Sequence, residues 1–147
     1  IDFGGHMTAV YNGLEFNTKL EAIWASFFDL ANWKWWYNPI AIDNWKPDFK
    51  VTLPCSHSEC SGSHTLMVSI VPIHDIESLS SHPSLSHSYG IFDNNKHWVA
   101  DGGALLGISP SVSRWEISHG AGGGVEDIFY RVNNADQLWE KAVASLT

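Results

Sequence analysis

The chain has 147 residues, of which 44% are hydrophobic and 16% are charged. That composition excludes a disordered or low-complexity protein and is typical of one globular domain with a sizeable core. Its net charge of −8 comes from 16 acidic and eight basic residues, so any basic DNA-binding surface must be local. No apolar run approaches the roughly 18 residues of a membrane-spanning helix.

The first residues are set apart from the rest. Residues 1–6, which precede Met7, are interpreted as an expression-vector remnant, and residues 7–147 are predicted to form a single domain. Because no secretory signal follows Met7, we expect the protein to be cytoplasmic.

The first predicted helix runs from Thr18 or Lys19 to about Leu30. Thr18 and Glu21 have the spacing of a capping box, in which the side chain of each residue bonds the backbone amide of the other. Apolar residues recur at a period near 3.6 and form one face: Leu20, Ile23, Trp24, Phe27, Phe28 and Ala31.

Two predicted strands follow this helix. Residues 35–37 and 40–42 are aromatic or β-branched, and Pro39 between them indicates an edge, a bend or a break. Residues 47–53 alternate like a half-buried strand, which places Asp48, Lys50 and Thr52 on one side.

The remaining chain predicts short strands and one more helix. Strands are expected at 66–71, 89–92, 97–100, 104–108 and 114–118, and residues 119–124 are expected to be a flexible glycine loop. The second helix is expected to be capped by Asn134, with Gln137 three residues later, and to pack on the sheet through an apolar face. We therefore predict an α/β fold with a mixed central sheet flanked by helices.

The serine-rich loop at residues 54–65 holds both cysteines of the chain. Cys55, His57, Cys60 and His64 are spaced so that two thiolates and two imidazoles could hold a zinc ion. An unliganded loop with two free thiols and a disulfide between Cys55 and Cys60 are the alternatives. The sequence leaves all three open.

Seventeen residues in the opening third of the chain together match the pattern of a known protein family: Tyr11, Gly13, Phe16, Leu20, Glu21, Ala22, Trp24, Ala25, Phe27, Phe28, Asp29, Trp36, Tyr37, Pro39, Pro47, Asp48 and Phe49. Through them the chain resembles the PD-(D/E)XK nuclease superfamily, in particular its small phage-type endonucleases. The resemblance combines a capped helix, an aromatic strand and a Pro-Asp-Phe turn, and implies a restriction-endonuclease-like core. Relatives of this kind are often carried on mobile elements.

The resemblance implies that Glu21 and Asp48 help to bind a divalent metal, Mg²⁺ or Mn²⁺. In the family an acid-x-Lys motif follows on the next strand, but residues 64–72 contain neither an acid nor a lysine. Phosphodiester hydrolysis by this route needs hard oxygen ligands and a positive group near the developing charge. The resemblance therefore implies a degenerate active site.

Each candidate residue also has a structural interpretation. Glu21 fits the capping box, and Asp48 after a proline fits a turn. Asp48 and Lys50 could form a re-registered acid-x-Lys site with Glu21, or a cross-strand ion pair. Asp75 and Glu77, just beyond the charge-free strand, are the nearest acids that could replace the missing one.

Two functional hypotheses follow. The first is a catalytically degenerate nuclease-like protein that serves as a binding module for a protein partner or for self-association. The second is a Mg²⁺-dependent DNA endonuclease with a re-routed active site, in which Asp75, Glu77 and Lys50 compensate for the missing groups.

Overall fold

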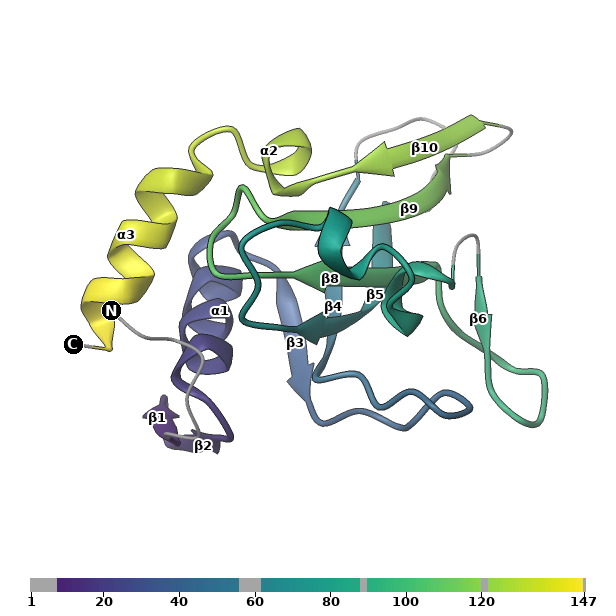
Figure 1. Ribbon diagram of the computed structural model, residues 1–147, viewed down its shortest axis with the longest axis horizontal. Helices are drawn as coiled ribbons and strands as arrows, with labels where there is room; N and C mark the ends of the chain where they lie inside the picture. Colours follow the sequence, from purple (N-terminus) through teal and green to yellow (C-terminus); the bar gives the residue numbers. More distant parts are fainter. Residues whose placement is uncertain (1–7, 56–61, 88–89, 120–121, 147) are drawn as a thin grey trace.

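A six-stranded mixed sheet forms the centre of the computed structural model, which describes residues 8–55, 62–87, 90–119 and 122–146. The β5–β8 pair is parallel and every other neighbouring pair is antiparallel. The prediction of an α/β domain with a mixed sheet is confirmed (Figure 1). In spatial order the strands are β10 (Gly122–Glu126), β9 (Ser113–His119), β8 (Gly102–Leu106), β5 (Ser63–Ile70), β4 (Phe49–Pro54) and β3 (Lys34–Tyr37).

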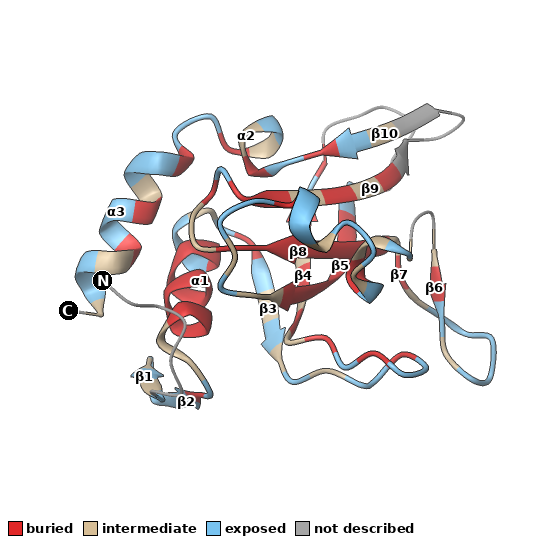
Figure 2. Cartoon of the chain, viewed as in Figure 1, coloured by how far each residue is buried: buried red, intermediate tan, exposed pale blue. Residues whose placement is uncertain are grey.

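Two helices, α1 (Lys19–Leu30) and α3 (Ala135–Ser145), share the main core with one face of the sheet. They meet through Trp24 and Trp139, whose ring centroids are 4.5 Å apart. In Figure 2, α1 is coloured as buried over most of its length, whereas α3 alternates between buried and exposed residues. The first helix is therefore the central one, and the short α2 (Ile128–Arg131) leads into the second.

The start of α1 agrees with the prediction. The Glu21 amide donates to Thr18 Oγ1 at 3.1 Å, and the Thr18 amide donates to Glu21 Oε1 at 3.0 Å. This capping box satisfies two amides that the first helical turn leaves without partners, and it fixes the helix start at Lys19. Further along, the Trp24 indole N–H donates to the carbonyl of Gly107 at 2.9 Å and ties the helix to the end of β8.

The opposite face of the sheet is covered by the segment that joins the parallel strands β5 and β8. This segment contains η1 (Glu77–Leu79), η2 (Pro83–Leu85), β6 (Ile91–Phe92) and β7 (Trp98–Ala100). The contact is close, because a Cβ atom at Gly103 would lie 2.1 Å from the Ser84 carbonyl oxygen. Two small apolar clusters, centred on Met67 and Leu105, complete this side.

Three expectations about local structure are corrected. Residues 40–42 are not a strand: Asn38 has a φ of 53°, so β3 ends at Tyr37, and only an isolated bridge joins Ile42 to Trp45. The glycine-rich residues 122–124 belong to β10, paired with β9, rather than to a loop. Asn134 is the N-cap of α3 but makes no side-chain capping bond.

The structure also contains an N-terminal hairpin that the sequence analysis did not predict. Strands β1 (Ala9–Tyr11) and β2 (Leu14–Phe16) pair through a turn at Asn12 and Gly13, whose φ angles are 51° and 81°. Asn-Gly is the usual sequence of such a turn, because both positions need a positive φ. Within the described part of the chain, no helix has the length and apolar character needed to cross a membrane.

Candidate functional site

Glu21 lies in the first turn of α1 with only 4% of its surface exposed. Its Oε1 atom accepts hydrogen bonds from the Thr18 amide at 3.0 Å and from the Tyr37 hydroxyl at 2.9 Å. Neither donor is positively charged, so the carboxylate is held by dipoles alone at this oxygen. Glu21 can therefore cap α1 and also belong to a metal-binding or catalytic site.

Asp48 immediately precedes β4 and is held against β5. Its amide donates to the Val68 carbonyl at 2.8 Å, and its Oδ2 atom accepts from the Ile70 amide at 2.8 Å. The residue thus extends the β4–β5 ladder by one position, with its side chain bonded at the end of β5. Pro47 ahead of it is buried, which restricts the approach of the chain to this point.

The structure brings the two carboxyl groups together. Burial, the charge of Glu21 and a hydrogen bond between the two side chains together raise the pKa of Asp48 from 3.8 to about 7, although the Ile70 amide and Lys46 oppose the shift. A buried carboxylate and a half-buried one beside it cannot both ionise at low cost, so the pair holds one proton up to about neutral pH.

Tyr37 is a site residue to which the sequence analysis gave no role. Its hydroxyl accepts from the Asn17 amide at 2.9 Å and donates to Glu21. Burial, followed by the hydrogen bond to Glu21 and the charges of Glu21 and Asp48, raises the pKa of Tyr37 well above its usual range, so the hydroxyl remains a donor. The signal available in the sequence was its position in the strand between the two acids.

Lys46 is the second residue that the sequence analysis missed. It is exposed, and its charge acts on Asp48 in the direction that favours the ionised carboxylate. No sequence motif marks Lys46, because only the folded path of the loop brings its charge to Asp48. Lys46 is therefore the cation that the structure places near the pair.

Lys50 lies elsewhere. Its ammonium group is 5.5 Å from the centroid of the Trp36 ring, which is directly opposite it on β3. Trp36 and Lys50 face away from the main core, whereas Tyr37 and Phe49 face into it. Within the described residues Lys50 makes no ion pair, so it acts as the cation of a cation–π contact.

Asp75 and Glu77 are both exposed, and Asp75 accepts a hydrogen bond from the Ser78 amide at 2.8 Å. Among the residues that the structure describes, no three His, Cys, Asp or Glu side chains gather into a group that could hold a metal. The Glu21–Asp48 pair thus offers two carboxylates. Such a pair fits a Mg²⁺ ion that keeps several of its waters.

Two members of the proposed zinc site, His57 and Cys60, lie outside the described residues. Of the other two, Cys55 is buried beside the Arg131 guanidinium, and His64 Nδ1 lies 3.4 Å from Asp101 Oδ2. The zinc, free-thiol and disulfide hypotheses all remain predictions.

A second buried carboxylate, Glu126, is fully paired. Arg131 donates to both of its oxygens, from Nε at 2.8 Å and from an Nη at 3.1 Å, and the Trp115 indole N–H donates at 2.9 Å. This bidentate geometry neutralises the charge and anchors α2 to the end of the sheet. It is a structural pair.

Comparisons with models of protein families, with curated proteins and with solved structures found no match to this chain.

Proposed function

We propose that this protein is a catalytically degenerate relative of the PD-(D/E)XK nucleases that acts as a binding module and keeps a weak divalent-cation site. A restriction-endonuclease-like core and a cytoplasmic location are parts of this proposal. The partner under this reading is a protein or a second copy of the chain.

One observation carries the proposal: Glu21 and Asp48 meet, but β5 offers no charged group to complete the site. The two residues come from elements 27 positions apart in the sequence, and both are committed by backbone hydrogen bonds to this location. This fixed carboxyl pair, in which Asp48 has a pKa of about 7, supports the proposal, because a metal site that lost its neutralising groups would leave two carboxyl groups sharing a proton.

Magnesium or manganese would be held by Glu21 and Asp48, with water at the remaining positions. When bound, such an ion supplies two positive charges that replace the shared proton. Tyr37 orients Glu21, and the Ile70 amide orients Asp48. With only two protein ligands, we expect weak binding that competes with protonation below neutral pH.

The second candidate function is a Mg²⁺-dependent DNA endonuclease with a re-routed site. Lys46 favours it, because its positive charge acts on Asp48 and could replace the lysine missing from β5. In this case Asp48 and Glu21 would hold the metal while Lys46 balances charge near the phosphate. The acidity of the whole chain weighs against tight binding of DNA.

The test is calorimetric titration of Mg²⁺ and Mn²⁺ into the protein and into the Glu21→Gln and Asp48→Asn variants. Glutamine can still serve in the capping box, so Glu21→Gln removes charge while keeping the helix start. Glu140→Gln, exposed on α3, is the matched control. Heat of binding that disappears in both site variants and persists in the control supports the proposal, whereas binding that survives both substitutions overturns the site.

A nuclease assay on the same proteins separates the two functions. The lead proposal expects no cleavage of single-stranded or duplex DNA with either metal. Metal-dependent cleavage that Asp48→Asn abolishes would instead establish the endonuclease. A further loss with Lys46→Ala would identify the replacement cation.

A further inference from the structure

Four large apolar side chains on the surface of the molecule are at least half exposed. The exposed fractions are 50% for Trp36, 56% for Ile40, 56% for Phe92 and 53% for Trp98. Phe92 and Trp98 are direct partners in the β6–β7 pair, so their side chains stand next to each other. Together with the pockets described next, these residues form the outer face.

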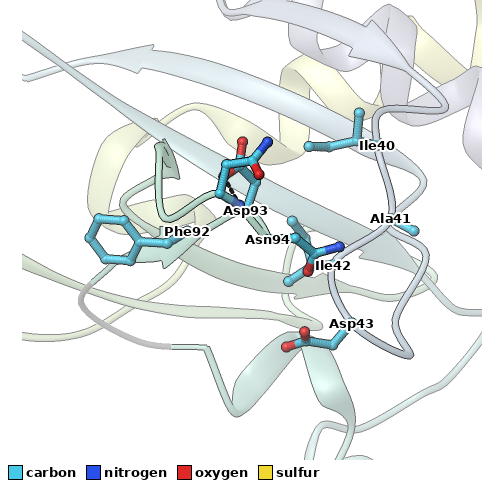
Figure 3. Close-up of a pocket in the computed structure, with 8 residues that line it drawn as sticks. Ile40, Ala41, Ile42, Asp43, Phe92, Asp93 and Asn94 are labelled. Carbon is cyan, nitrogen blue, oxygen red and sulfur yellow. Dashed lines mark hydrogen bonds between the residues drawn. The ribbon is translucent and has the colours of Figure 1, made fainter.

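Ile40 joins the two halves of the outer face, because it lines two adjacent shallow pockets. The first pocket, of about 290 Å³, is lined by apolar side chains and one cation: Trp36, Pro39, Ile40, Lys50, Met67 and Val99. The second, of about 250 Å³, lies between residues 40–43 and residues 92–95. Figure 3 shows Ile40 to Asp43 on one segment and Phe92 to Asn94 on the facing one.

The two pockets carry opposite charges. Lys50 is the charged group of the first pocket, whereas Asp43 and Asp93 are the charged groups of the second. Asp93 is engaged by the Asn95 and His97 amides of its own turn, while Asp43 is exposed at a tight turn. The outer face therefore has a positive and a negative half on either side of Ile40.

This arrangement complements itself. A two-fold axis near Ile40 would lay the positive half of one molecule on the negative half of another, so that Lys50 of each copy would face Asp43 of the other. Exposed tryptophan and phenylalanine beside a methionine have the composition of protein interfaces. A nucleic acid would instead meet the repulsion of Asp43 and Asp93 in the second pocket.

We propose that the protein self-associates as a two-fold dimer through the outer face, with Ile40 at the axis. This inference rests on the binding role proposed above and names its partner. The dimer leaves the Glu21–Asp48 pair outside the interface, because Tyr37 and Glu21 lie on the core side of β3.

The experiment is sedimentation velocity over a concentration series with the Lys50→Glu and Asp43→Lys variants. Each variant alone places like charges opposite each other twice in the dimer, and we expect its dissociation constant to rise about tenfold or more. An equimolar mixture of the two variants restores opposite charges at both contacts, so we expect a heterodimer near wild-type strength. Lys141→Glu and Glu140→Lys, exposed on α3, are charge-matched controls without effect.

A wild-type protein that stays monomeric at every concentration overturns the inference. So does a dimer that neither charge reversal weakens, or a pair of weakened variants that does not recover on mixing. A monomer that binds a short oligonucleotide through Trp36 would assign the outer face to nucleic acid instead. Metal titration reports on the carboxyl pair alone. A protein that does not dimerise but still binds metal therefore refutes this inference without refuting the proposed cation site.

Discussion

The molecule buries acidic side chains in two places and treats them differently. Glu126, 5% exposed, receives a bidentate Arg131 and an indole N–H. Glu21, 4% exposed, receives only a hydroxyl and an amide at its bonded oxygen, and it lies against a second carboxyl group, Asp48. The first arrangement neutralises its charge, and the second retains a proton instead.

The difference separates a structural acid from a candidate functional one. Burying a carboxylate is costly unless a cation and hydrogen bonds compensate it, and Glu126 is compensated completely. At the Glu21–Asp48 pair the cation whose charge acts on Asp48, Lys46, is exposed, so it compensates the buried negative charge only in part. A cation from solution binds most favourably to such a pair of acidic groups, which has no buried counterion among the described residues.

Removing the counterion of the compensated acid is expected to have the largest effect. Arg131→Met keeps the apolar stem of the side chain but leaves Glu126 buried and uncompensated. We expect the free energy of unfolding to fall by about 3 kcal/mol at neutral pH. Urea denaturation followed by circular dichroism measures it.

The control is the double variant Arg131→Met with Glu126→Gln. Because it removes the stranded charge, we expect it to recover most of the lost stability. A single variant as stable as the wild type would show that Glu126 is not held by this pair.

At the uncompensated Glu21–Asp48 pair, removing a charged group should raise the stability of the fold instead of lowering it. Asp48→Asn removes a carboxyl group whose pKa burial and Glu21 raise from 3.8 to about 7. In the wild type, the shared proton stabilises the fold fully below pH 3.8, and this contribution is lost as the pH rises through about 7. We therefore expect the variant to be more stable than the wild type by about 1–2 kcal/mol at pH 8, with a smaller gap at pH 5.

Urea denaturation of both proteins at the two pH values measures that gap, and Glu140→Gln on the exposed side of α3 is the control. An equal gap at both pH values would mean that Asp48 does not titrate in this range. That outcome would show that the Glu21–Asp48 pair does not share a proton, so it would not differ from Glu126 in this respect.

A smaller effect is expected where a neutral donor supports the pair. Tyr37→Phe removes the hydroxyl that bonds Glu21 and the Asn17 amide, and we expect a loss of about 1 kcal/mol of stability. Thermal unfolding measures it, with Tyr130→Phe, 67% exposed, as the silent comparison. Equal melting temperatures for both variants would show that the hydroxyl contributes nothing to holding Glu21.

The sequence predicted best where local physics decides the structure. The start of α1 followed from its capping box, and the faces of β4 followed from strict alternation. The prediction of a strand at residues 40–42 was wrong, because a positive φ at Asn38 ends β3 before these hydrophobic residues. The glycines of β10 have no side-chain pattern, so only pairing with β9 makes them a strand.

For the candidate site, the sequence named both acids but could not choose their cation. Lys50 has the acid-x-Lys spacing, yet its ammonium group lies over the ring of Trp36 on the outer face. Lys46 has no motif around it, and only the three-dimensional path of the loop brings its charge to Asp48. Distances across a sheet are set by register, which a single sequence does not reveal.

The single parallel pairing among the described strands, β5 with β8, divides the sheet into two antiparallel meanders. The connections within each meander are shorter than the one that joins the halves, which closes about 30 residues of intervening chain at an entropic cost on the order of 3 kcal/mol. Glu21, Tyr37, Asp48 and Ile70 all belong to the first half with α1. The carboxyl pair can therefore assemble on the folding pathway before the two halves of the sheet dock. The hydrogen bond from Trp24 to the Gly107 carbonyl joins α1 to the second half, so it forms only once the halves have docked.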